Sequence, residues 1–230
     1  MSYQKTKNPL SWIVTLSLSF VVTFPTYAVE FPSAPERDPP QSTAAGGRRG
    51  GCVSGNLPIK AFTPGDDNYI TTTSSQPQLF VYLPKTKAKF LQFSLRGENG
   101  ENLNQQEIPI NNGDYVVKIS IPDDVNLVDN KKYGWEVSLI CNPMFINSGN
   151  YTKGIIEKIA LSEEVKMQLA QNPETTEKAE IYASQNIWSE TLALVYSVKN
   201  SQPQQWNELL TSVGLQDYAD KEFYQVSLFK

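Results

Sequence analysis

Between residues 79 and 161 apolar side chains alternate with polar ones, and this period of two limits the chain more than any other feature. Such alternation is typical of β-strands with one buried face. It is clearest around Leu91, Ile119 and Val137, and clusters of Gly, Asn, Asp and Pro separate the runs. Weaker runs at 79–83, 103–110 and 151–161 bring the expectation to about five or six strands. We therefore predict a small antiparallel β-sandwich over residues 56–161.

After Leu161 the apolar period becomes helical. Ser162, followed by two glutamates, is a typical helix N-cap. Gly214 can adopt the left-handed conformation of the residue that ends a helix. Two apolar stripes lie between these caps: Ile187, Trp188, Leu192, Val195 and Val198, then Trp206, Leu209, Leu210 and Val213. The sequence thus predicts an α+β protein in which residues 162–230 form a helical hairpin or three-helix segment packed on the sandwich, with 223–229 as a final edge strand.

The N-terminus has the order of a secretory signal peptide. Lys5 and Lys7 precede an apolar run over residues 10–24, and small residues lead to Ala28. The run is shorter than the roughly 20 residues that span a bilayer. We expect residues 1–28 to be removed by cleavage after Ala28, leaving a soluble mature protein without an integral membrane segment, in the periplasm or secreted.

Residues 29–55 are rich in Pro and Gly and poor in apolar side chains, so we predict a flexible lead. The lead ends near Cys52, and the other cysteine is Cys141. In an oxidising compartment the simplest interpretation is one disulfide, which would contribute about 4 to 5 kcal/mol in the chain-entropy model. The alternative is two independent buried thiols.

The chain contains no histidine, and this excludes several chemistries at once. Ser-His-Asp and Cys-His catalysis and histidine-ligated zinc all require that residue. The formal net charge of -4 offers no basic face for nucleic acid. We predict no cofactor, no metal and no nucleic-acid partner. Carboxylate, Lys, Tyr and Ser-Lys chemistry remain open.

Two adjacent acid pairs, Asp66 with Asp67 and Asp123 with Asp124, are weak candidates for calcium binding or a carboxylate dyad. Neighbouring side chains on an extended chain point in opposite directions, and neither stretch has the order of an EF-hand loop. Solvated turn acids are the favoured interpretation.

The tryptophans Trp188 and Trp206 are candidates for a binding surface for sugar or peptide, together with Trp135. Each lies on an apolar stripe at its own element's period, which favours core packing.

Several short motifs occur in a fixed order: GRRGGC at 47–52, PQLFVYLP at 77–84, YGWEVSLIC at 133–141, GIIEK at 154–158, NIWSETL at 186–192 and WNELL at 206–210. In them the chain resembles the cyanobacterial exported family of domain of unknown function 928 over residues 46–215. It departs from the family pattern at Asn186, where glycine is usual, and at residues 189–192, where Tyr-Asp-Ala-Leu is usual. The resemblance implies a periplasmic location, two matched cysteines and a β part followed by helices, without an assigned reaction. The last helices also resemble one tetratricopeptide-type hairpin.

The favoured hypothesis is a non-catalytic interaction or scaffold module of the cell envelope, whose partner is another envelope or secreted protein. The alternatives are a carboxylate-based carbohydrate-active enzyme and a sugar- or peptide-binding sandwich. Two carboxylates in one cleft, one with a raised pKa, would favour the enzyme. Exposed tryptophans would favour the sugar- or peptide-binding sandwich.

Overall fold

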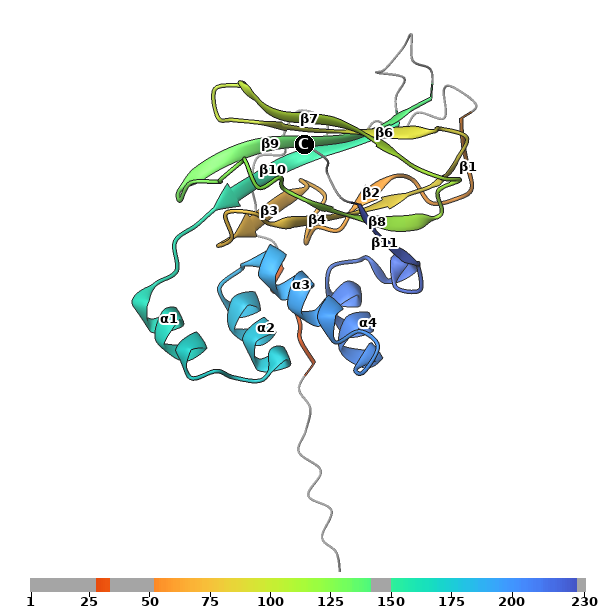
Figure 1. Ribbon diagram of the computed structural model, residues 1–230. Coiled ribbons are helices and arrows are strands. Elements are labelled where there is room, and N and C mark those ends of the chain that lie inside the picture. The colour runs from red at the N-terminus through yellow and green to blue at the C-terminus, as the bar shows by residue number, and fades with distance from the viewer. Residues whose placement is uncertain (1–27, 34–51, 142–149, 227–230) are drawn as a thin grey trace, which may run out of the picture.

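The computed structural model describes residues 28–33, 52–141 and 150–226, and it arranges them in three layers (Figure 1). The outer layer is a five-stranded sheet in the order β3 (Tyr69–Thr72), β10 (Tyr151–Lys158), β9 (Lys131–Ile140), β6 (Phe90–Arg96) and β7 (Asn102–Pro109). The middle layer is a four-stranded sheet in the order β11 (Phe223–Val226), β8 (Tyr115–Ser120), β4 (Gln78–Leu83) and β2 (Lys60–Ala61). A short ribbon pairs β1 (Val53–Ser54) with β5 (Lys85–Thr86).

The helices form the third layer, below the four-stranded sheet in Figure 1. They are α1 (Glu163–Ala170), α2 (Thr175–Ser184), α3 (Trp188–Ser197), α4 (Pro203–Ser212) and the short 3-10 helix η1 (Gln216–Tyr218). The α+β prediction of a sandwich followed by C-terminal helices is confirmed.

The sandwich is not wholly antiparallel, however, because β3 pairs parallel with β10 and β11 pairs parallel with β8. These two strands come from near the two ends of the described chain and reach their partners through long connections. A long connection allows a parallel pair, whereas a tight hairpin does not.

The inner faces of the two sheets make the core that the alternating runs predict. Leu91, Phe93 and Leu95 of β6 are fully buried, and their neighbours on β9 continue the same face. On the facing sheet, Val81 pairs with Val117. Both are buried, and β4 and β8 thus complete the sandwich interior.

The other face of the four-stranded sheet packs against the helices through aromatic rings. The ring of Phe80 lies 5.3 Å from that of Tyr196, and the ring of Tyr82 lies 5.0 Å from that of Tyr218. Phe223 of β11 packs edge-on against Trp206 at 5.4 Å. A sheet with both faces covered has no solvent face, which explains why β4 is buried along most of its length.

Both helix caps expected from the sequence are present. The Ser162 hydroxyl accepts a hydrogen bond from the Val165 amide at the start of α1. Gly214 has a φ of +73°, and the Leu215 amide closes back onto the Leu210 carbonyl at 2.7 Å. Leu210 and Leu215 are both fully buried, so this cap also seals the end of α4.

The N-terminal segment differs from the prediction of a flexible lead over residues 29–55. Val29 and Phe31 are buried among the helices, so the prediction is wrong for them. The ring of Phe31 meets that of Trp188 edge-on at 4.9 Å, which explains why so short a segment is held in place. Most of the predicted lead, residues 34–51, lies outside the described residues, as does the predicted signal peptide up to residue 27. Among the described helices, none is long and apolar enough to cross a membrane.

Candidate functional site

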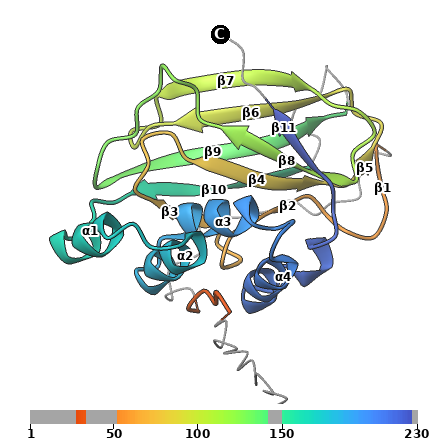
Figure 2. The same ribbon diagram turned by 60° about the horizontal axis from the view of Figure 1, so that its bottom comes forward.

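One long side of the sandwich is open, between the edge strand of each sheet. β7 ends the five-stranded sheet and β11 ends the four-stranded sheet, and an opening of about 760 Å³ lies between them. Figure 2 shows β7 as the outermost strand of the sandwich, with β11 crossing in front of the sheets on the same side. The opening is lined by the end of β7, the loop that follows it, β8 and β11: Ile108, Pro109, Ile110, Asn111, Asn112, Gly113, Asp114, Tyr115, Val117, Glu222, Tyr224, Gln225 and Val226.

The floor of the opening is apolar and its mouth is aromatic. Ile108 and Val117 are almost completely buried. At the mouth, the rings of Tyr115 and Tyr224 lie 4.5 Å apart, and Tyr224 is 50% exposed. Tyr224 pairs with Val117 across the β11 and β8 register, so its side chain lies on the face that points toward the other sheet.

The loop before β8 is held in an unusual conformation. Asn112, Gly113 and Asp114 all have a positive φ, of 57°, 66° and 71°. A side chain at Gly113 would place its Cβ 2.0 Å from the carbonyl oxygen of Pro84, so only glycine fits there. Hydrogen bonds from the Thr86 amide to Asn112 and from the Asp114 amide to Leu83 fix the loop against β4 and β5. The polar end of the opening is therefore rigid.

The charged side chains that line the opening are both acids, Asp114 and Glu222. Lys221 donates to Asp114 at 2.6 Å and Tyr82 donates to it at 2.9 Å. These two hydrogen bonds, the one from Lys221 first, lower the pKa of Asp114. Glu222 accepts a hydrogen bond from the hydroxyl of Tyr224 at 3.0 Å. The opening thus presents aromatic, amide and carboxylate groups to a ligand, and its acids favour a neutral or cationic one.

β7 offers an exposed backbone edge beside the opening. It pairs with β6, which is its one partner strand in the described part of the chain. Through this pairing Asn104 lies opposite Leu95, so its side chain is on the inner face of the sheet. The Oδ1 atom of Asn104 is buried and has no hydrogen-bond partner among the described residues. A buried acceptor of this kind is costly unless a donor reaches it.

The acid pairs predicted from the sequence lie elsewhere and do not come together. Asp66 is exposed and pairs with Lys60 at 3.1 Å, and Asp67 accepts from the Tyr69 amide. Asp123 and Asp124 are exposed in the turn after β8. Within residues 28–33, 52–141 and 150–226, no group of three His, Cys, Asp or Glu side chains could hold a metal ion.

The tryptophans are core residues, which is the interpretation favoured by their apolar stripes, and they do not provide the candidate binding surface. Trp188 and Trp206 are each only 1% exposed, because they fill the interface between the helices and the four-stranded sheet. Their indole nitrogens donate to the carbonyls of Phe62 at 2.7 Å and Ala219 at 3.0 Å. Trp135 is also buried. The two cysteines, Cys52 and Cys141, are joined in a disulfide that ties the start of β1 to the end of β9.

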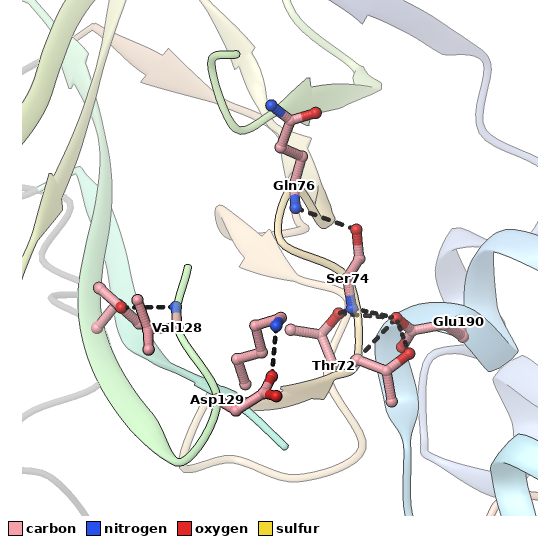
Figure 3. Close-up of polar contacts among 9 residues, drawn as sticks. Thr72, Ser74, Gln76, Val128, Asp129 and Glu190 are labelled. Carbon is pink, nitrogen blue, oxygen red and sulfur yellow. Dashed lines mark hydrogen bonds and ion pairs between the residues drawn. The ribbon is translucent and has the colours of Figure 1, made fainter. Parts of the chain in front are cut away.

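A polar joint on the opposite side of the sandwich was not predicted. Figure 3 shows Glu190 of α3 pointing into the turn that follows β3. Its Oε1 atom accepts from the amides of Thr73 and Ser74, both at 2.9 Å, and from the hydroxyls of Thr72 and Thr73. The run Thr71-Thr72-Thr73-Ser74 was the available sign, since hydroxyl residues are frequent in such turns. This joint fastens the helical layer to the sheet.

Fold and opening together define a class: a three-layer α+β sandwich with one open side between two strand edges. Within this class the chain belongs to the family described as Domain of Unknown Function (DUF928), whose model matches residues 44–223. No curated protein matches the chain.

Proposed function

We propose that this is an exported, non-catalytic binding module of a cyanobacterial cell envelope that receives an extended segment of another envelope or secreted protein. One observation carries the proposal: two strand edges, β7 and β11, flank an opening with an apolar floor. An extended peptide gains main-chain hydrogen bonds by adding to such an edge, and it gains specificity from pockets for alternate side chains.

The lining of the opening narrows the kind of segment. The side chain on the inner side of an added strand would reach Ile108 and Val117, and an aromatic or proline ring would stack on Tyr224. Because Asp114 and Glu222 are the charged groups of the lining, a neutral or basic segment fits better than an acidic one.

Binding is favoured over carboxylate catalysis by the state of Asp114. A glycosidase-type acid donates a proton and therefore needs a raised pKa. Lys221 and Tyr82 lower the pKa of Asp114, which keeps it ionised. Asp114 is therefore a fixed acceptor that holds the loop and the C-terminal strand together.

The proposal of export rests on the sequence of residues 1–28 and on cleavage after Ala28, with a periplasmic or secreted product. The disulfide between Cys52 and Cys141 supports it, because such bonds persist in oxidising compartments.

The test is photo-crosslinking in the native envelope from two exposed positions. A photoreactive residue replaces Tyr224 at the opening or, as the matched control, Met167 on α1, which is 62% exposed. We expect a single protein adduct from position 224, lost when Ile110→Asp places a charge in the opening, and none from position 167. Equal adducts at both positions, or none at 224, would contradict the proposal. Binding of envelope glycans to the opening, abolished by Tyr224→Ala, would instead assign it to sugars.

A further inference from the structure

A short N-terminal segment of the chain packs against the helical layer. Residues 28–33 lie beside α3 and α4 in Figures 1 and 2 and are separated along the chain from Cys52 by residues 34–51. Their burial alternates: Val29 and Phe31 are buried, whereas Glu30 and Pro32 are exposed. Alternation of this kind is the mark of an extended peptide with one face against a surface.

Side chains of α4 recognise the backbone of this segment. The amide of Val29 donates to Oε1 of Gln205 at 2.8 Å, and the amide of Phe31 donates to Oγ of Ser212 at 3.2 Å. Gln205 and Ser212 lie about two turns apart on one face of α4, so the segment runs along the helix in the same direction. Amides two residues apart in an extended chain point the same way, which matches this pair of acceptors.

The two buried side chains supply the apolar part of the contact. Phe31 packs edge-on against Trp188 of α3 with ring centroids 4.9 Å apart. Val29 is 0% exposed. Gln205 is itself a buried polar residue at 7% exposure, and such groups are placed where a partner meets them. Side-chain acceptors for the backbone amides of the segment, together with the ring of Trp188, provide both the polar and the apolar contacts of a peptide site.

We propose that the surface formed by Trp188 of α3 and by Gln205 and Ser212 of α4 is a binding site for an extended peptide with apolar side chains two residues apart, and that residues 29–33 of this chain are its separable ligand. The segment binds in cis because the chain tethers it, and a second copy of the segment supplied in trans can exchange with it. This site is distinct from the opening between β7 and β11, so it stands or falls independently of the proposed function.

The experiment uses the mature chain from Val29, with a site for a specific protease inserted within residues 34–51. The protein is folded and then cut, and gel filtration with mass spectrometry shows whether the N-terminal fragment stays with the body. A labelled synthetic peptide of residues 29–33 is added to measure exchange. We expect the fragment to co-elute and to be displaced by the labelled peptide.

Matched peptides identify the contacts. Phe31→Ala in the peptide should weaken binding by at least about tenfold, because a buried aromatic side chain is lost. Glu30→Ala should change it by less than about twofold, because that side chain is exposed. The substitution Gln205→Ala in the body should also weaken binding of the unchanged peptide. The proposal is overturned if the cut fragment dissociates and the labelled peptide does not bind in its place, whether or not the body stays folded. It is also overturned if the two variant peptides bind equally well.

Discussion

On the side of β2 and β3 the sandwich is closed by protein, whereas on the side of β7 and β11 it is open. On the closed side β2 contacts β10, α3 packs against β3, and Glu190 fastens the turn that follows. On the open side the two edge strands stand apart around an opening of about 760 Å³. Contacts along the closed side therefore stabilise the fold, whereas the open side is available to a ligand. Substitutions on the two sides should differ in how much they lower the free energy of unfolding.

The largest effect is expected in the aromatic layer beneath the four-stranded sheet. Trp206→Ala should lower the free energy of unfolding by about 3 to 5 kcal/mol, since it empties a fully buried site among Phe62, Tyr196 and Phe223. Urea denaturation measures the change. Met167→Ala, on an exposed part of α1, is the control and should change stability by less than about 0.5 kcal/mol. A Trp206→Ala protein as stable as the control would mean that this layer does not hold the fold.

A smaller loss of stability is expected when Glu190, which fastens α3 to the turn after β3, is replaced. Glu190→Ala leaves the amides of Thr73 and Ser74 without their acceptor, and this should cost about 2 to 3 kcal/mol. The same denaturation assay applies, together with faster amide hydrogen exchange at Thr73 and Ser74. Glu208→Ala, which removes a half-buried glutamate of α4 that accepts a hydrogen bond from the exposed side chain of Gln204, is the matched control. Exchange that stays slow at both amides would refute the role of Glu190.

Alkaline pH should destabilise the aromatic layer. Burial raises the pKa of Tyr196 and Tyr218, and burial with the hydrogen bond to Asp114 raises the pKa of Tyr82. A raised pKa in the folded state contributes stability that is complete below the unfolded value of about 10 and is lost as the pH rises. Stability should therefore fall above about pH 10, by about 1.4 kcal/mol for each pKa unit of difference. Tyrosinate absorbance recorded against pH, with and without urea, tests this, and simultaneous titration of all tyrosines in the native protein would disprove it.

The smallest effect on the free energy of unfolding is expected from Asp114, which lines the opening. Because Lys221 and Tyr82 lower the pKa of Asp114, its contribution is present above the unfolded pKa of about 3.9 and is lost as the pH falls. The side chain of Asp114 is 44% exposed, so screening by solvent keeps this contribution below about 1 kcal/mol. Asp114→Asn should remove this part of the acid dependence, measured as denaturation midpoints from neutral to acid pH. An unchanged acid dependence would show that the ion pair with Lys221 has no net effect.

The sequence predicts those features whose cause is local. The strand with Leu91, Phe93 and Leu95 follows from alternation, and the end of α4 follows from Gly214 with its flanking leucines. β3 was missed because all four of its residues are buried, between β10 and α3, and no alternation results. The docking of Val29 and Phe31 was missed because their neighbours are prolines and polar residues.

The candidate site could not be predicted from the sequence, for a different reason. Its lining joins Ile108 to Tyr224, which meet only because β11 returns from the helical layer to pair parallel with β8. Tyr115 and Tyr224 carry no motif, and the aromatic candidates that the sequence did offer, the tryptophans, are core residues. A site made by the edges of two sheets requires the order of strands in both sheets, which periodicity does not contain.

The disulfide between Cys52 and Cys141 also decides how the molecule would respond to mechanical force. It closes a covalent ring of separation 89 that includes both β1 and β9 and every strand between them. When the two ends of the chain are pulled apart, tension passes across the bond, so the ring cannot be drawn out until the bond is reduced. At about 3.3 to 3.6 Å per residue, the ring conceals about 300 Å of contour length. An oxidised molecule would therefore extend by that much less than a reduced one, and the described parts outside the ring, residues 28–33, β10, the helices and β11, would bear the load.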